Sequence, residues 1–322
     1  MNSWDFDDPA LQTLERPDGP YHVPVMAEEV VALLRPAPGM IFLDGTAGGG
    51  GHSERLLQYG AEVIALDQDA DAIAICRQRL APYACRLHLC EANYEDADTV
   101  LDQLGIKSLG GALLDLGVSS YQLDTADRGF AMMRNGPLDM RMSRSNPQTA
   151  ADIVNIASPA ELARIFREYG EEPRAMHIAS RIAALREQRP IRTTFDLAAA
   201  VTSVIPRTGA RHPATRIFQA LRIAVNDELG VLVRGLETIA FRLAHGARFA
   251  VISFHSLEDR IVKTFFRDRS AEWIDRPEWP EPRHNPARIF RLLTPRPMDA
   301  SGEEVQINPR ARSAKLRVVE RI

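Results

Sequence analysis

The stretch Asp44-Gly45-Thr46-Ala47-Gly48-Gly49-Gly50-Gly51-His52-Ser53 directly follows the apolar run from Met40 to Leu43. A glycine-rich turn between a buried strand and a helix lets the backbone approach a ligand closely, and the start of the helix supplies unpaired N–H groups. We therefore predict that residues 40–43 form a first strand, that the glycines form a ligand-binding loop, and that a helix runs from Ser53 to Tyr59.

Strands and helices alternate around this loop. The apolar runs predict further strands at residues 62–66, 86–90 and 111–114, and helices at residues 27–34 and 71–80. Strands that alternate with helices at this spacing are joined by right-handed crossovers and form a mostly parallel sheet. The pattern predicts an α/β fold.

A long helical segment interrupts the predicted sheet. The next convincing strand, residues 248–253, begins more than a hundred residues after the fourth, which is too far for a single crossover. Ser158 and Glu161 form a predicted capping box at the start of the intervening helices. The remaining predictions are helices at residues 158–169, 175–188, 196–204, 213–229 and 257–269, and a closing antiparallel hairpin of strands 288–293 and 314–319.

The glycine loop discriminates between ligand classes. The dinucleotide pattern G-x-G-x-x-G fails, because the frames that begin at Gly48 and Gly49 reach Ser53 and Glu54 where the last glycine is required. The phosphate-binding pattern G-x-x-x-x-G-K-[ST] fails as well, because Gly51-His52 stands in place of the lysine and the hydroxyl residue. S-adenosylmethionine is the third class, since its methionine and ribose lie over such a loop without phosphate chemistry.

Side chains at the ends of the other strands support a nucleoside ligand. Asp67 ends the second strand, where a carboxylate accepts hydrogen bonds from ribose hydroxyls in NAD sites too, so it indicates a nucleoside and not one cofactor. Tyr94 follows the third strand, beside the expected adenine, and Asp115 ends the fourth, facing the methyl donor. His52 is either a cofactor contact or a helix-start residue, and Gln122 is equally ambiguous by itself.

Composition bounds the class of protein. The 322 residues are 45% hydrophobic, which is enough for a sizeable core. No apolar run approaches the roughly 20 residues of a membrane span, and the acidic amino terminus is the opposite of a secretory signal, so we expect a cytoplasmic protein without a membrane partner. The three cysteines lack C-x-x-C spacing, so neither disulfides nor a zinc site is expected.

The distribution of charge along the chain is compatible with a nucleic-acid partner. The net charge of −4 argues against one, but residues 181–222 carry eight basic and two acidic side chains, and residues 283–322 carry nine and four. Nearly all the basic residues are arginines, which bind phosphate bidentately, although a GC-rich genome would produce the same bias.

Several longer motifs resemble those of one family, the bacterial 16S ribosomal RNA (cytosine-N4)-methyltransferases. The resemblance spans Tyr21 to the carboxyl end of the chain. It is carried by Tyr21-His22-Val23-Pro24-Val25-Met26, Asp44-Gly45-Thr46 with Gly50-Gly51-His52-Ser53, Leu114-Asp115-Leu116-Gly117-Val118-Ser119-Ser120, Arg128-Gly129-Phe130, Gly136-Pro137-Leu138-Asp139-Met140-Arg141-Met142, His212-Pro213-Ala214-Thr215-Arg216, Ser253-Phe254-His255-Ser256-Leu257-Glu258-Asp259-Arg260 and Asn308-Pro309-Arg310-Ala311-Arg312-Ser313.

The resemblance implies a Rossmann-like S-adenosylmethionine-dependent methyltransferase sheet with an inserted all-helical domain. Residues 1–20 would be a flexible acidic extension, residues 21–127 and 213–322 the methyltransferase domain, and residues 128–212 the insert. The implied cofactor is S-adenosyl-L-methionine. Its implied contacts are Gly50, Gly51, His52, Asp67, Tyr94, Asp115 and Gln122, with Tyr94 standing where phenylalanine is frequent in the family.

The implied substrate is the N4 amine of a cytidine in the decoding region of 16S rRNA, within the small ribosomal subunit or its assembly intermediate. Such a base must be unstacked to reach the pocket, so folded rRNA is expected to be a better substrate than a short oligonucleotide. No metal is expected, and a homodimer is left open. The arginines expected to contact phosphate are Arg141, Arg216, Arg260, Arg310 and Arg312.

The sequence identifies the catalytic group less clearly than it identifies the cofactor-binding residues. Cytosine N4 is a poor nucleophile because its lone pair is delocalised, so an acceptor for N4–H would help. Asp115 is primarily an expected cofactor contact and only secondarily a catalytic candidate, because the Asp/Asn/Ser-Pro-Pro-aromatic motif of many amino-methyltransferases is absent there. His255 is the second candidate, to orient the base or move a proton, while Ser256 and Asp259 are expected to cap the next helix. No cysteine lies near the fourth or fifth strand, which disfavours carbon-5 methylation through a thiol.

Three alternatives stay open at this point. A methyltransferase acting on a protein or small molecule fits the loop and the net charge, and steep salt dependence of substrate binding would favour RNA instead. An rRNA-binding assembly factor could keep the fold without turnover. A nicotinamide oxidoreductase is disfavoured by the two failed glycine frames.

Overall fold

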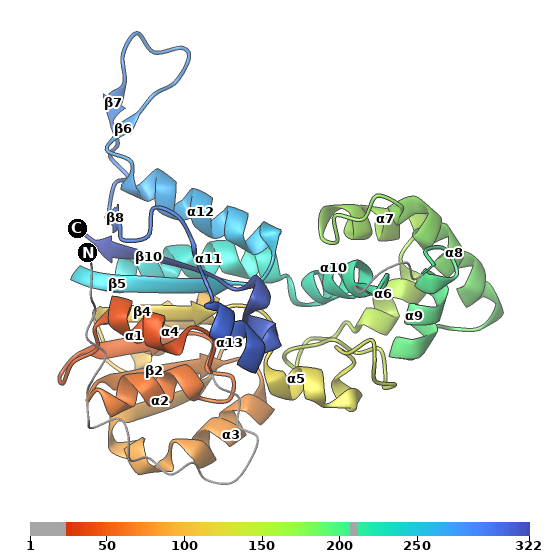
Figure 1. Ribbon diagram of the computed structural model, residues 1–322, viewed down its shortest axis with the longest axis horizontal. Helices are drawn as coiled ribbons and strands as arrows, with labels where there is room; N and C mark the ends of the chain where they lie inside the picture. The colour runs from red at the N-terminus through yellow and green to blue at the C-terminus, as the bar shows by residue number, and fades with distance from the viewer. Residues whose placement is uncertain (1–23, 207–211) are drawn as a thin grey trace.

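The computed structural model describes residues 24–206 and 212–322, so the predicted acidic extension at residues 1–20 lies outside the described residues. A sheet of parallel strands, extended by antiparallel strands at one side, forms one part of the molecule, and a group of helices forms the other (Figure 1). No helix in the two described ranges is both long and apolar enough to cross a bilayer.

The sheet has the strand order β3-β2-β1-β4-β5-β10-β8, with β9 also pairing with β10. The first five strands are parallel and β10 runs antiparallel to β5 and β8, so the predicted mostly parallel sheet and its antiparallel closing pair are confirmed. The strands are β1 (Ile41–Asp44), β2 (Glu62–Asp67), β3 (Leu87–Glu91), β4 (Leu109–Asp115), β5 (Leu243–Ser253), β8 (Phe290–Leu292), β9 (Met298–Asp299) and β10 (Lys315–Arg321).

Alternating side chains of the strands supply two hydrophobic cores. Phe42 and Val63 lie in the core on one face, whereas Leu43 and Ile64 lie in the core on the other, as the period of two in a strand requires. The first face is covered by α1 (Ala27–Leu34), α2 (Gly51–Gln58) and α3 (Ala70–Arg79), and the second by α4 (Ala97–Gln103), α11 (Glu228–Arg242) and α12 (Ser256–Ser270).

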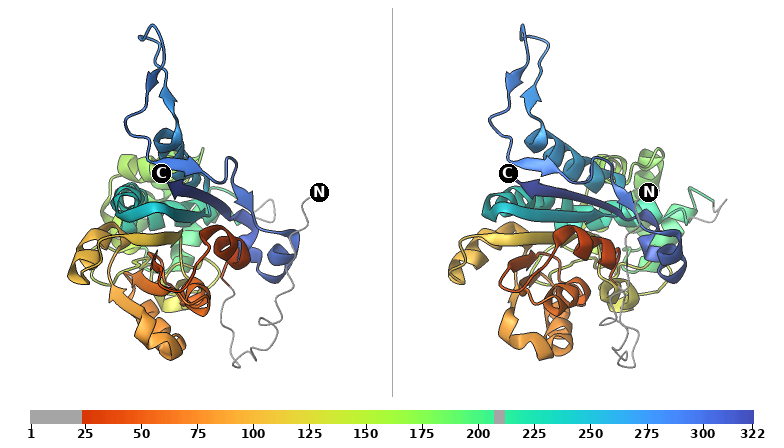
Figure 2. Two further views of the ribbon diagram at one scale, coloured as in Figure 1. Left: turned by 90° about the vertical axis from the view of Figure 1, so that its left-hand side faces the viewer. Right: turned by 60° about the vertical axis from the view of Figure 1, so that its left-hand side comes forward.

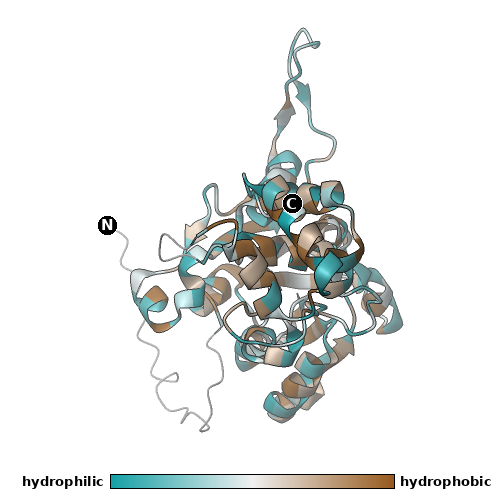
Figure 3. Cartoon of the chain, turned by 90° about the vertical axis from the view of Figure 1, so that its right-hand side faces the viewer, coloured by the Kyte–Doolittle hydropathy of each residue, from teal (hydrophilic) through white to brown (hydrophobic). Residues whose placement is uncertain are grey.

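The helices between β4 and β5, apart from α11, have a hydrophobic core of their own, built around residues such as Phe166, Ile182 and Leu221. Figure 3 shows mixed hydrophobic and hydrophilic faces along them, as expected for amphipathic helices that bury one side. Because Leu221 lies in α10, we propose that the helical part extends through α10 and does not end at residue 212. Its helices are α5 (Ser120–Asp124), α6 (Ala150–Ile156), α7 (Pro159–Glu168), α8 (Ala175–Gln188), α9 (Thr194–Thr202) and α10 (Thr215–Asn226).

Two local predictions were wrong. The single helix expected at residues 213–229 is broken at Asp227, which adopts a left-handed conformation with φ 47°, so that α10 ends there and α11 begins. The expected Ser256–Asp259 cap of α12 is instead made one residue earlier, where His255 is the N-cap and forms a reciprocal capping box with Glu258.

A narrow hairpin of β6 (Trp273–Ile274) and β7 (Arg283–His284) projects from the end of α12 (Figure 2). At its base the Trp273 and His284 rings lie 3.9 Å apart. Beyond β9, the short helix α13 (Gly302–Ile307) and a 3₁₀ turn at Pro309–Ser313 return the chain to the edge of the glycine loop before β10.

Candidate functional site

A cavity of about 570 Å³ lies at the carboxyl ends of β1, β2 and β4, where open α/β sheets bind ligands. The volume is within the roughly 300–1,000 Å³ of small-molecule sites. Six of the seven predicted cofactor residues line it, and Gly50 is buried beneath them. The six are Gly51, His52, Asp67, Tyr94, Asp115 and Gln122.

The glycine loop has both the conformation and the close packing that require glycine. Gly50 is the N-cap of α2 with φ 79°, and a Cβ there would lie 3.1 Å from Leu80 Cδ1 and 3.2 Å from Cys76 Sγ. A Cβ at Gly51 would meet Pro24 at 3.1 Å. A larger residue at Gly50 or Gly51 would require the loop or its neighbours to shift, whereas a Cβ at Gly49 would meet nothing within 4 Å.

Asp67 fastens the loop to the end of β2. Its Oδ2 accepts a hydrogen bond from Gly48 N at 2.8 Å, and its Oδ1 accepts one from Asp69 N at 2.9 Å. Burial raises the pKa of Asp67 to about 6, although the two N–H groups favour the ionised form, and the nearby carboxylates of Asp69 and Asp44 raise it further. Each carboxylate oxygen keeps a second lone pair for a ligand hydroxyl.

Asp44 supports the loop from below. It is fully buried, accepts a 2.6 Å hydrogen bond from Ser53 Oγ, and accepts a second from Thr46 N. Burial raises the pKa of Asp44 despite these bonds. The Asp44-to-Ser53 stretch is therefore closed on itself by its first and last side chains.

His52 and Asp115 face each other across the floor of the cavity. His52 Nε2 lies 3.6 Å from Asp115 Oδ2, and the buried atoms His52 Nδ1, His52 Nε2 and Asp115 Oδ1 have no hydrogen-bond partner among the described residues. Burial lowers the pKa of His52, but Asp115, Asp44 and Glu304 raise it by more, so the net pKa lies above its usual value. Unpaired polar atoms inside a cavity are costly unless a ligand or water meets them.

Tyr94 occupies the wall between the cavity and α11. Its ring packs so closely on Gly235 that a Cβ there would lie 2.3 Å from one ring carbon. Burial, followed by the charges of Glu258 and Glu228, holds the pKa of Tyr94 well above its usual value, so its hydroxyl stays protonated. The ring is thus fixed in the cavity wall, and its contact with adenine stays a prediction.

Gln122 has a structural function that its sequence context did not reveal. It is the third residue of α5 and completes a capping box with Ser119, and its Nε2 donates to Asp69 Oδ2 at 2.8 Å. Arg128, which was not predicted as a site residue, donates to the same oxygen at 2.6 Å and to the carbonyl of Met142 at 2.8 Å. Arg128 is buried and thereby joins the rim of the cofactor cavity to the helical part.

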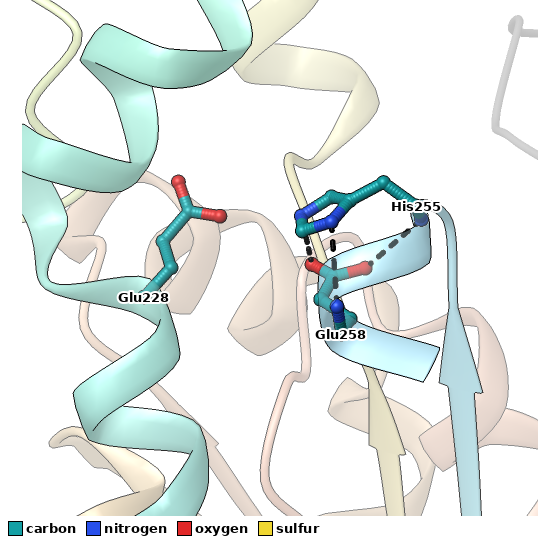
Figure 4. A group of neighbouring side chains, drawn as sticks. All are labelled: Glu228, His255 and Glu258. Carbon is teal, nitrogen blue, oxygen red and sulfur yellow. Dashed lines mark hydrogen bonds and ion pairs between the residues drawn. The ribbon is translucent and has the colours of Figure 1, made fainter. Parts of the chain in front are cut away.

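A charged cluster, consisting of Arg222, Glu228, His255 and Glu258, lies at the α11 and α12 side of the same cavity. Arg222 Nε and Nη2 each donate to Glu228 at 2.8 Å, and Nη2 lies 4.0 Å from Glu258 Oε1. Figure 4 shows Glu228 facing the His255–Glu258 pair, whose Nε2 and Oε1 atoms are 3.1 Å apart. Arg222, Glu228 and Glu258 line the cavity, and the three were missed because no sequence spacing links them.

The protonation of this cluster follows from its contacts. Burial opposes ionisation of Glu258, but His255, Arg222 and the N–H of Phe254 outweigh it, so the pKa of Glu258 is lowered. Burial raises the pKa of Glu228 despite Arg222. His255 Nδ1 accepts from Glu258 N at 3.4 Å, and His255 Nε2 lies 3.1 Å from Glu258 Oε1 but has no hydrogen-bond partner among the described residues.

Glu228, His255 and Glu258 also offer three ligand atoms within 4.8 Å of one another, a spacing that a metal ion can use. Arg222 already neutralises Glu228 through two hydrogen bonds. A divalent cation would therefore have to displace that guanidinium.

The five arginines predicted to contact phosphate do not gather at one point. Arg310 lines the cavity, and Arg312 is exposed on the neighbouring turn. Four of the five lie near acidic side chains: Arg141 with Asp139 at 2.8 Å, Arg216 with Glu172 at 3.6 Å, Arg260 with Glu171 at 3.4 Å, and Arg310 with Asp124 at 3.1 Å.

Known proteins match this chain over nearly its whole length. Residues 20–322 match the model of the MraW methylase family. The chain is 50% identical over 305 residues to a "Ribosomal RNA small subunit methyltransferase H" of Anaeromyxobacter dehalogenans, covering 94% of this chain and 98% of that protein. It is also 50% identical to proteins of the same name from Syntrophotalea carbinolica, over 307 residues with 94% and 98% coverage, and Thermobifida fusca, over 310 residues with 94% coverage of both.

Proposed function

The chain belongs to the MraW methylase family, and from that membership we propose that it methylates the N4 amine of a cytidine in the 16S rRNA of the small ribosomal subunit. It is a methyltransferase that uses S-adenosylmethionine. The observation that supports the site assignment is the cavity over the glycine loop, lined by Asp67, Tyr94 and Asp115.

The residues present fit S-adenosylmethionine. The loop backbone is held open by glycines, Asp67 has acceptor capacity for ribose hydroxyls, and His52 and Asp115 present buried polar atoms that lack partners. When bound, the cofactor supplies a methyl group activated by a sulfonium. The carboxyl groups of Asp67 and Asp115 line the cavity and provide a suitable environment for that positive charge.

The chain's own contribution is to position the base and exclude water. Placing an amine in line with a methyl donor removes several kcal/mol of barrier through orientation alone, about 7 to 11 kcal/mol in favourable model systems. Asp115, at the end of β4, is proposed to bind the cofactor. His255, which caps α12 and contacts Glu258, is proposed to position that glutamate and is not assigned a direct step.

The RNA substrate is supported by the names of the relatives and by Arg310 at the cavity with Arg312 beside it. Arg310 lines the cavity, Arg312 is exposed on the same turn, and Arg260 lies on α12. Arginines that are exposed or lie in open ion pairs can exchange a carboxylate for a phosphate at little cost. Action in the cytoplasm on a ribosomal particle follows from this proposal, and a homodimer stays a prediction for light scattering to test.

The decisive experiment is transfer of labelled methyl groups to 30S particles from cells that lack this protein, followed by nuclease digestion and nucleoside analysis. Label in N4-methylcytidine is expected. Label in protein would favour a protein substrate instead. Cofactor binding without transfer to any component would favour a non-enzymatic assembly function.

A further inference from the structure

Two polar atoms of the charged cluster keep hydrogen-bonding capacity, and both belong to residues that line the cavity. Arg222 Nη1 makes no hydrogen bond to the described residues, and it is not among the fully buried unpaired atoms, so it retains surface in the cavity that Arg222 lines. Glu258 Oε1 is also absent from the fully buried unpaired atoms; it lies 3.1 Å from His255 Nε2 and keeps a further lone pair, while the N–H groups of Phe254 and His255 occupy Oε2. One is a donor and the other an acceptor.

The surrounding contacts hold this pair in place. Glu228 binds Arg222 at two points, which fixes the plane of the guanidinium. The capping box of α12 fixes Glu258, and His255 Nε2 lies 3.1 Å from Oε1. Preorganisation of this kind is what a recognition site requires, since flexible side chains would lose affinity to ordering.

The pair matches one edge of one pyrimidine. Cytosine presents an N4 amine donor beside its N3 and O2 acceptors, whereas uracil presents an O4 acceptor beside an N3–H donor. An acceptor at Glu258 and a donor at Arg222 therefore complement cytosine, and both atoms would face like groups on uracil. The composition of the cluster agrees as well, because two carboxyl groups stand against one guanidinium, so acceptors are available for an amine donor.

Resting on the proposed function, we propose that Glu258 Oε1 accepts a hydrogen bond from N4 of the target cytosine while Arg222 Nη1 donates to its N3 or O2, so that this pair selects cytosine over uracil. The bond from N4–H to a carboxylate also draws the delocalised lone pair back toward nitrogen, which makes N4 a better nucleophile. Glu258 is then a substrate-binding residue, and Glu228 and His255 are positioning residues.

The test compares wild type with Glu258→Gln and a matched control, Asp259→Asn. If the amide oxygen of the new glutamine keeps the capping bonds, its NH₂ replaces the cavity acceptor with a donor. Asp259 is the next residue on α12 but pairs with Arg317 of β10 at 2.7 Å, outside the cavity. The first measurement is the preference for cytidine over uridine monophosphate in the presence of S-adenosylhomocysteine, by saturation-transfer NMR, which needs no turnover.

We expect wild type and Asp259→Asn to prefer cytidine monophosphate, and Glu258→Gln to lose that preference. In methyl transfer to 30S particles, Glu258→Gln should lose about 10- to 100-fold in kcat/KM. Its affinity for S-adenosylmethionine and its thermal midpoint should stay near those of wild type, which separates recognition from a structural effect of the cap.

Three results would overturn the inference. The first is equal binding of cytidine and uridine monophosphate by wild type. The second is a preference for cytidine monophosphate that is unchanged in Glu258→Gln. The third is loss of methyl transfer on chelation with recovery on adding Mn²⁺, which would make the cluster a metal site. Failure of the proposed function would look different, because the nucleotide preference of the pair could persist while no label enters rRNA.

Discussion

The raised pKa of Asp67 predicts that cofactor affinity depends on pH in a specific window. Burial raises the pKa of Asp67 in the cofactor-free protein from 3.8 to about 6. This shift in pKa corresponds to about 3 kcal/mol that disfavours the ionised carboxylate. Ribose hydroxyls donate hydrogen bonds to the ionised carboxylate, so bound cofactor lowers the pKa of Asp67. The affinity for the cofactor therefore reaches its full value well above pH 6, and it falls as Asp67 becomes protonated below pH 6.

The size of the effect can be bounded. If bound cofactor returns the pKa of Asp67 to its ordinary value, affinity at pH 5 should be roughly tenfold weaker than at pH 7. Calorimetry between pH 5 and pH 8, in buffers of different ionisation enthalpy, should also detect proton release on binding near pH 6.

Asp67→Asn supplies the control, because an amide cannot titrate. It should bind the cofactor more weakly at pH 7.5 and show little change in affinity down to pH 5. His52 also lies in the cavity and has a raised pKa, so His52→Gln should retain the dependence. A wild-type affinity that stays constant from pH 7 to pH 5, in protein shown to remain folded, would refute the assignment of Asp67 to the ribose.

Three substitutions test the packing around the cavity. Gly235→Ala would place a Cβ 2.3 Å from the Tyr94 ring, so we expect weaker cofactor binding by calorimetry and a loss of about 1 to 3 kcal/mol in thermal unfolding; unchanged binding would show that the ring position does not matter. Arg128→Met leaves Asp69 buried without its cation and should cost about 3 to 5 kcal/mol in urea unfolding, and a loss below 1 kcal/mol would contradict the buried pair. Ser53→Ala removes a 2.6 Å hydrogen bond to the buried carboxyl group of Asp44 and should cost about 1 to 3 kcal/mol by the same assay; unchanged stability would contradict the importance of this bond.

The sheet was predictable because its signal is local. Apolar runs such as Val63 to Leu66 form strands buried on both faces, and the polar residue that ends each run marks the ligand edge. The loop residues were predictable for the same reason. The break at Asp227 was not, because aspartate carries no breaker signal as strong as glycine or proline, yet its short side chain tolerates the left-handed conformation.

The charged cluster was unpredictable for a different reason. Arg222 and Glu258 are separated by thirty-six positions and by strand β5, and they meet only because the break at Asp227 turns α11 onto the sheet. His255 was correctly located after β5, but its use as a cap could not be distinguished from a cap at Ser256 without the backbone angles. Tertiary packing determined both the contact between Arg222 and Glu258 and the position of the cap of α12.

The position of β10 has a consequence for how the chain is made. It follows every other strand along the chain, yet it lies inside the sheet, bonded to β5 on one side and to β8 and β9 on the other. During translation the five parallel strands can assemble first, which leaves the hydrophobic edge of β5 unpaired until residues 315–321 emerge. An open edge of that kind invites association with other nascent chains. The interval before β10 emerges is therefore when a growing copy of this protein is most in need of a chaperone.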